Sequence, residues 1–185
     1  MLRAFVFCWI ALVSFPVLAE DESAPKPEGM VLLTVGGLVG KSNRGPLDTD
    51  RDSMLSSVGA DFKNAYAFDR DMLLALPQGT VTVKPTGWDQ EAVFKGPYLR
   101  DVLVVIEAAK VKTRFVALGG YSGFLLPEDI DGSDYIIALE ADGKPLGLNG
   151  YGPLWLLNER EGGISGGDNG RGSHVWSLIY MHLGE

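Results

Sequence analysis

From residue 30 onward the apolar positions fall in short runs that are rich in β-branched and aromatic residues and bounded by Gly, Pro, Asn and Asp. Runs of this kind are typical of strands separated by turns. The Asp142-Gly143 pair between two such runs is a hairpin-turn signal. We expect strands over residues 31–35, 80–84, 114–118, 135–139, 154–157 and 175–181, with a glycine bend at Gly36 and Gly37.

Two segments show helical features instead. Asp69 is a good N-cap for residues 70–76, and Pro77 cannot extend that helix. A second helix is expected from Tyr98, after Gly96-Pro97, with a core stripe at Leu99, Val102, Leu103 and Ile106. Since the expected strands outnumber the helices, the sequence predicts an α+β fold, a β-rich domain with a mixed sheet.

Long polar stretches separate some of these elements. Residues 41–52 are expected to form a loop around Gly45-Pro46, which is either functional or disordered. Residues 159–172 are rich in Gly, Ser, Asp and Asn and are expected to form a mobile loop or flap.

The N-terminus has the pattern of an export signal. Arg3 precedes an almost wholly apolar run, and Val17 and Ala19 place small residues before a cleavage point at Glu20. We therefore expect a signal peptide over residues 1–19, a flexible leader over 20–29 and one domain over 30–185, located in the periplasm. An uncleaved anchor is the alternative, although the run is short for a spanning helix.

Composition narrows the class of ligand. The chain has 16 basic and 24 acidic residues, and the exported part without Arg3 keeps 15 against 24, a net charge of −9. Such a surface repels nucleic acid and anionic lipid, so a small molecule or a protein is the expected partner, without stable membrane insertion. The single cysteine, Cys8, lies in the expected signal peptide, so the mature chain would have no disulfide, thiolate metal ligand or cysteine nucleophile.

Trp88 follows the turn through Pro85, Thr86 and Gly87, where neither strand nor helix periodicity requires a large aromatic residue. An indole in such a turn can line a pocket for a planar ligand, and it can also serve as a lid on the core.

Several motifs, in order along almost the whole mature chain, resemble the molybdopterin-binding domain of the sulfite oxidase family. They are Leu33-Thr34-Val35, Phe68-Asp69 with Leu73 and Leu76-Pro77, Val81-Thr82-Val83, the run from Phe94 to Leu103, Tyr121 with Pro127, Ala138 with Asp142 to Leu146, and Gly152-Pro153-Leu154. The resemblance implies the fold of that domain and a pocket for a pterin.

In that family a cysteine after a strand similar to residues 81–84 completes the molybdenum coordination. Pro85 or Thr86 occupies the corresponding region here, and neither supplies a thiolate. Because molybdenum favours sulfur ligands, molybdenum is not expected. The chain is closer to short exported relatives without this cysteine, some of which are implicated in pterin sensing on the periplasmic part of a membrane cyclic-di-GMP enzyme.

A pterin needs an aromatic stacking face, acceptors for its amino edge and a donor for its ring oxygen. Trp88 and Tyr121 are the stacking candidates, and carboxylates in nearby turns are candidate acceptors. The candidate pocket residues are Thr86, Trp88, Asp89, Tyr121, Ser122, Asp129, Asn149, Arg171 and Ser173, with Glu128 and Asp131 as further acceptors. Trp176 is expected in the core, and an ordinary turn role competes with ligand binding at Asn149.

Three functions remain open. The leading hypothesis is a non-catalytic periplasmic receptor for a pterin, neopterin- or monapterin-like or molybdopterin-like, that regulates a membrane cyclic-di-GMP signalling enzyme. The alternatives are a molybdopterin-dependent oxidoreductase with an atypical metal site and a pterin-free interaction module. The two histidines, His174 and His182, are expected to lie too far apart along one strand to share a metal.

Overall fold

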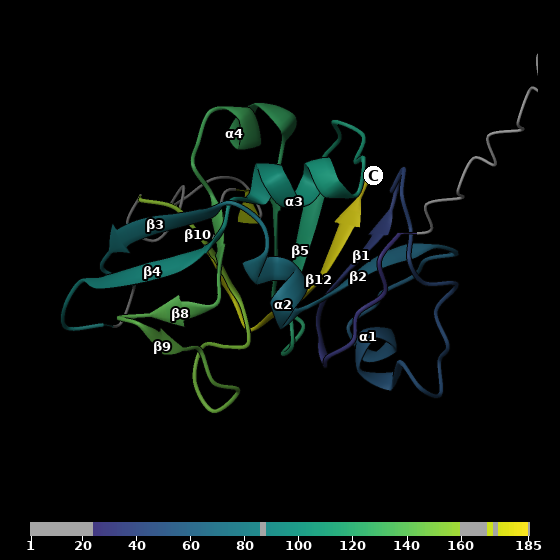
Figure 1. Ribbon diagram of the computed structural model, residues 1–185, viewed down its shortest axis with the longest axis horizontal. Helices are drawn as coiled ribbons and strands as arrows, with labels where there is room; N and C mark the ends of the chain where they lie inside the picture. The colour runs from purple at the N-terminus through teal and green to yellow at the C-terminus, as the bar shows by residue number, and fades with distance from the viewer. Residues whose placement is uncertain (1–23, 86–87, 160–169, 172–173, 185) are drawn as a thin grey trace, which may run out of the picture.

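The largest sheet of the protein has five strands in the order β2-β1-β12-β5-β6 (Figure 1). The computed structural model describes residues 24–85, 88–159, 170–171 and 174–184. The strands are β1 (Val31–Gly37), β2 (Ala65–Asp69), β5 (Thr113–Ala117), β6 (Ser122–Leu125) and β12 (Leu178–Leu183). β1 and β12 are parallel, and the other neighbours in this sheet are antiparallel.

Two smaller sheets form the other half of the fold. One has the order β3-β4-β8-β9, from β3 (Gln78–Val83), β4 (Ala92–Pro97), β8 (Glu140–Ala141) and β9 (Lys144–Pro145). The other has the order β11-β10-β7, from β7 (Ile136–Ala138), β10 (Trp155–Leu157) and β11 (Val175–Trp176). The chain passes from β7 in one small sheet to β8 in the other through Leu139. The Leu139 N–H donates to the carbonyl of Lys95 in β4 at 2.9 Å, so β4 stays beside the chain across this junction.

The described helices are short: α1 (Ser53–Ser57), α2 (Arg70–Leu74), α3 (Leu99–Val105) and α4 (Pro127–Asp131). The protein is thus a mixed α+β domain built mostly of sheet, as the sequence predicted. No helix within the described ranges is long and apolar enough to cross a membrane.

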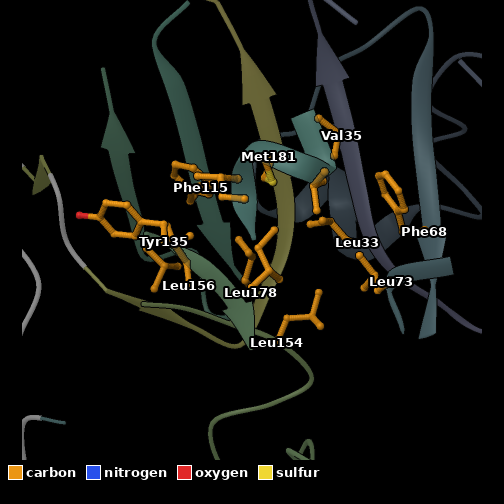
Figure 2. Close-up of a cluster of buried hydrophobic side chains, with 14 of the residues drawn as sticks. Leu33, Val35, Phe68, Leu73, Phe115, Tyr135, Leu154, Leu156, Leu178 and Met181 are labelled. Carbon is orange, nitrogen blue, oxygen red and sulfur yellow. The ribbon is translucent and has the colours of Figure 1, made fainter. Parts of the chain in front are cut away.

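The main core lies between the five-stranded sheet, the β7–β10–β11 sheet and the helices. Figure 2 shows Leu33, Phe115 and Met181 from the large sheet directed into the same cluster as Leu154 and Leu156. Leu99, Val102 and Ile106 of the expected helical stripe are fully buried there, and Leu103 packs against the cluster. The 3.6-residue spacing therefore predicted the buried face of α3 correctly.

Several local predictions are confirmed. Asp69 caps α2, because its carboxylate accepts the Met72 N–H at 2.9 Å. Asp142 and Gly143 have φ values of 49° and 71°, the left-handed pair that a tight hairpin turn requires, and they join β8 to β9. Gly37, with φ of 86°, ends β1 where a Cβ would lie 2.2 Å from the Leu183 carbonyl oxygen.

The last predicted strand, 175–181, is wrong as a single element. Ser177 has a positive φ of 51°, and the chain bends there from β11 in one sheet to β12 in another. Serine carries no turn signal strong enough to predict this bend, and the residues on both sides of Ser177 are apolar, as they would be in one continuous strand. Strand β2 was missed for a related reason: all five of its residues are buried, so it shows no alternation.

Residues 24–29 differ from the expected flexible leader. Ala24 is buried in the main core, and the Asn43 side chain donates to the carbonyls of Pro25 and Ala67 at 2.8 and 2.9 Å. The Glu28 and Gly29 N–H groups both donate to the Asp69 carboxylate at 2.8 Å. These six residues therefore pack as part of the domain, whereas residues 1–23 lie outside the described ranges.

Asp69 is expected to contribute strongly to stability because its buried carboxylate accepts three backbone N–H groups. The hydrogen bond from Gly29, followed by that from Met72, lowers the pKa of Asp69 below its ordinary value. Asp69→Ala should lower the free energy of unfolding by about 2 kcal/mol in urea titrations, because the three donors lose their acceptor. Asp71→Ala, an exposed acidic residue in the same helical turn, is the matched control, and equal losses in both variants would contradict this role.

Candidate functional site

Aromatic side chains from distant parts of the sequence form a continuous cluster beside β10. Trp88, after β3, lies with its ring centroid 5.5 Å from that of Tyr151 and 6.0 Å from that of Trp155. Tyr151 stacks on Trp155 at 4.6 Å with 14° between the ring planes, and Phe94 meets the edge of Trp155 at 5.2 Å. Trp88, predicted from its unusual turn, is thus half-buried among other rings.

The cluster continues to the surface through Trp176. Its ring centroid lies 6.1 Å from Tyr151 and 6.4 Å from Trp155, and Tyr121 stacks on it at 5.9 Å with 8° between the planes. Tyr121 and Trp176 are each 46% exposed. The expectation that Trp176 belongs to the core is wrong, because its ring covers the cluster with one side open to solvent. We call Trp88, Tyr151, Trp155, Trp176 and Tyr121 the aromatic row.

Strand register explains why these rings share a face. Trp155 pairs with Ala138 on one side and with Trp176 on the other, and paired residues point to the same face of a sheet. The intervening pairs, Leu156 with Ile137 and Val175, point to the opposite face and enter the main core. The β7–β10–β11 sheet is therefore apolar on both faces, one built into the core and the other carrying the aromatic row.

The indole N–H of Trp155 is buried and has no hydrogen-bond partner within the described ranges. The Trp155 side chain is only 2% exposed and is surrounded by the other rings. A buried donor without an acceptor costs about 1–3 kcal/mol, so native structures rarely keep one without a reason. An acceptor atom on a bound molecule would remove this cost.

The carboxylate of Asp129, a predicted acceptor, is already engaged. Arg171 donates to it from Nε and Nη2 at 3.0 and 2.9 Å, and the Leu126 N–H donates at 2.9 Å. Arg171 also reaches Glu128 at 3.3 Å. These contacts, that with Asp129 foremost, raise the pKa of Arg171. The structure thus pairs two predicted ligand-binding residues with each other, and Asp129 could accept from a ligand only in competition with Arg171.

The other predicted residues are scattered. Ser122 begins β6 beside Gly170, and Asp131, at the end of α4, pairs with Lys110 at 2.9 Å. Asn149 is exposed in the turn before Tyr151, and Asp89 is exposed next to Trp88. Thr86 and Ser173 lie outside the described residues, as does most of the expected loop at 159–172.

Tyr151 and Trp155 were missed by the sequence analysis. One signal that could have found them is the strand alternation from Leu154 to Leu156, which directs Trp155 to the face opposite the two leucines. The other is the second aromatic residue, Tyr151, in the turn just before. The same run also reads as a short buried strand without a site, so sequence alone could not separate the two.

His174 is buried directly before β11 and lies against Asn158, which directly follows β10. Its Nε2 accepts the Asn158 backbone N–H at 3.2 Å and lies 3.1 Å from the Asn158 side-chain oxygen. Burial lowers the pKa of His174 to about 4, so the ring is neutral at pH 7. His182 lies on β12 and contacts the Tyr180 hydroxyl, so the two histidines belong to different sheets.

Within the described ranges, no group of three or more His, Cys, Asp or Glu side chains is placed to hold a metal ion. The sequence resemblance implies a pterin, with or without molybdenum. The aromatic row and the unpaired Trp155 N–H suit a planar heteroaromatic molecule with a ring acceptor. In the sequence, β3 is followed by Lys84, Pro85 and Thr86, none of which supplies a sulfur ligand for molybdenum.

Fold and site together define the class: a β-rich α+β domain that presents a partly exposed aromatic cluster on one face of a small sheet. No protein-family model matches the chain, and a search of curated proteins also finds no match.

Proposed function

We propose that this protein binds a pterin at the aromatic row and acts as a non-catalytic receptor. The observation that carries the proposal is the combination of two exposed, nearly parallel rings, Tyr121 and Trp176, with the unpaired indole N–H of Trp155 behind them. Flat rings on a rigid sheet favour a planar ligand, and an unpaired donor favours one with a ring acceptor.

The choice of a pterin among planar ligands rests on the sequence resemblance. Its motifs fall on the elements around the row: residues 81–83 are in β3, the run from Phe94 to Leu103 spans β4 and α3, and Asp142-Gly143 forms the β8–β9 turn. A fold of the sulfite oxidase molybdopterin-binding type is part of the proposal and rests on this sequence resemblance.

Each part of the pterin would have a counterpart. The bicyclic ring stacks on Trp176 or Tyr121. A ring acceptor receives the Trp155 N–H once the side chains that cover this buried group are displaced by the ligand. Asp89 is the candidate acceptor for the amino edge, because it is exposed beside Trp88 and the Asp129 carboxylate is held by Arg171. Without a sulfur ligand at residues 85 and 86, binding rather than oxo transfer is the function that these residues support.

Export and signalling complete the proposed function. The expected signal peptide would place the protein in the periplasm, where the resemblance suggests that ligand occupancy is passed to an inner-membrane cyclic-di-GMP enzyme. Residues 24–29 pack on the domain, so they would reach such a partner as part of a fixed surface rather than as a free leader.

The decisive experiment identifies the ligand carried by the protein from its native compartment. We expect denaturation of the purified protein to release a fluorescent pterin, identified by mass spectrometry, in near-stoichiometric amount and without molybdenum in metal analysis of the same sample. The Trp176→Ala variant, purified in parallel, should release much less.

Two results would contradict the proposal. Stoichiometric molybdenum on a pterin dithiolene would favour the oxidoreductase, with a substrate to be sought. Protein free of any pterin, combined with no binding of added neopterin or monapterin by the wild type in fluorescence titration, would favour the interaction module.

A further inference from the structure

Three basic side chains gather on the outer face of the five-stranded sheet, at the end of β12. Arg114 of β5 is the cross-strand partner of His182 of β12, and Lys112 lies two residues before Arg114 on the same face. Together with Gly184 these residues line a shallow hollow. We call Lys112, Arg114 and His182 the basic cluster.

The cluster has no described carboxylate to neutralise it. Neither Lys112 nor Arg114 has a carboxylate oxygen of the described residues within 4.0 Å, whereas other arginines of the protein, such as Arg44 and Arg171, are ion-paired. The ammonium group of Lys112 lies over the Phe124 ring, 4.7 Å from its centroid. The Arg114 Nε is buried and makes no hydrogen bond within the described ranges.

The remaining neighbours leave the cluster facing outward. The Tyr180 hydroxyl lies 3.0 Å from His182 Nδ1 and donates to the Asp61 carbonyl at 3.3 Å. His182 Nε2 has no described partner. Burial raises the pKa of Tyr180, and the charge of the exposed Asp61 carboxylate helps to raise it. Asp61 and Arg114, both within the described ranges, form no ion pair with each other.

An unpaired, half-buried guanidinium is costly because desolvation is not repaid by a partner. Charge-assisted hydrogen bonds to an oxyanion would repay it, and the planar arginine fork and the lysine point charge are the groups that proteins use for phosphate and sulfate. The protein carries a net charge of −8, so its long-range field repels anions and local unpaired cations are needed to hold one.

We propose that Lys112, Arg114 and His182 form a binding site for a small tetrahedral oxyanion, phosphate or a phosphomonoester group. The hollow is too shallow to enclose an anion, so the anion lies at its mouth, where Arg114 and Lys112 donate from two sides and His182 Nε2 from the third. In that arrangement the Tyr180 hydroxyl gives its single hydrogen to Nδ1 instead of to the Asp61 carbonyl, which places the hydrogen of the neutral ring on Nε2.

This site is separate from the aromatic row. Phe115 and Met181, the chain neighbours of the cluster residues, point into the main core (Figure 2). The aromatic row lies on the face of the β7–β10–β11 sheet that is directed away from this core. The proposal does not depend on pterin binding, and either one can fail without the other.

Thermal unfolding at constant ionic strength tests the site. With 20 mM inorganic phosphate replacing chloride at pH 7, we expect the melting temperature of the wild-type protein to rise by about 4 °C, corresponding to a dissociation constant of about 2 mM. Arg114→Gln should reduce the rise to below about 1 °C and weaken the dissociation constant at least about 10-fold. Lys144→Gln, an exposed lysine on β9, should keep the full rise.

A second measurement locates the anion. In an NMR titration with phosphate, the amide of Gly184 and the ring of His182 should shift in the wild type and remain fixed in Arg114→Gln. Glycerol 3-phosphate should give the same shifts, because only the oxyanion group is recognised; shifts with one of the two anions alone identify whether the natural source is free phosphate or a monoester.

If Arg114→Gln does not fold, Lys112→Gln replaces it with the same expected loss. An unchanged melting temperature of the wild type in phosphate would overturn the proposal, and so would an equal rise in the Arg114→Gln and Lys144→Gln variants. Glu185 follows Gly184 in the sequence and lies outside the described residues; as an acidic residue it could compete with phosphate for the basic cluster. A phosphate response that appears only in the Glu185→Gln variant would also overturn the proposal.

Discussion

Trp176→Ala should weaken pterin binding about 10- to 100-fold, because truncation removes a stacking face worth about 1–3 kcal/mol. The ring is 46% exposed, so most of the loss should appear in affinity rather than in stability. Fluorescence titration with neopterin and monapterin measures the change, and Tyr121→Ala should have an effect of the same kind because Tyr121 stacks on Trp176.

Matched variants separate stacking from general damage to the surface. Trp176→Phe keeps a flat ring and should retain part of the affinity. Val104→Ala, which removes a 72% exposed apolar side chain from α3, should leave binding unchanged. Unchanged affinity in Trp176→Ala, with the ligand still bound stoichiometrically, would place the pterin elsewhere on the protein.

Trp88→Ala gives a contrasting result. Since Trp88 is half-buried against Phe94, Tyr151 and Trp155, its removal should lower both affinity and the free energy of unfolding, the latter by about 2–3 kcal/mol. The sequence made Trp88 a stacking candidate, whereas the packing makes Trp176 the better probe of binding. Similar stability of the two variants in urea would contradict this distinction.

Acidification from pH 6.5 to pH 4 should remove about 3 kcal/mol of folding free energy through His174 alone. Burial lowers the pKa of this ring from its ordinary 6.5 to about 4 in the folded protein. Between these values the unfolded chain binds a proton at this position and the folded protein does not, so the contribution is fully present above pH 6.5 and falls as the pH decreases.

The structural reason is burial, because the charged ring would lose its hydration inside the protein. Urea unfolding at half-unit pH intervals measures the slope, and His174→Gln should lack the slope between pH 6.5 and 4. Asp69, with its lowered pKa, loses its contribution only below its ordinary value of 3.8, outside this window. An identical slope in His174→Gln would show that other groups cause the loss.

Local chemistry predicted the parts of the fold that depend on neighbouring residues. The Asp69 cap, the Asp142-Gly143 turn and the buried stripe of α3 follow from interactions within a few residues, so the sequence is sufficient for them. The missed elements have no such signature: β2 is buried throughout, and the bend at Ser177 is imposed by two sheets that compete for consecutive residues.

The candidate site divides in the same way. Trp88 and Tyr121 stand out in the sequence because an aromatic residue in a glycine-containing turn needs an explanation. Their connection through Tyr151, Trp155 and Trp176 depends on which strands pair, and nothing local specifies that Trp155 lies opposite Trp176.

The sequence by itself determined the α+β class, the helices α2 and α3 with the Asp69 cap, and the acidic, cysteine-poor composition, because propensity, turn chemistry and charge are properties of the residues themselves. Tertiary structure decided which polar groups have partners. Asp129 is held by Arg171, whereas Arg114 and the Trp155 indole are left without a described partner. Pairing depends on distances between segments far apart in the chain, so only the packed structure could reveal the aromatic row and the basic cluster.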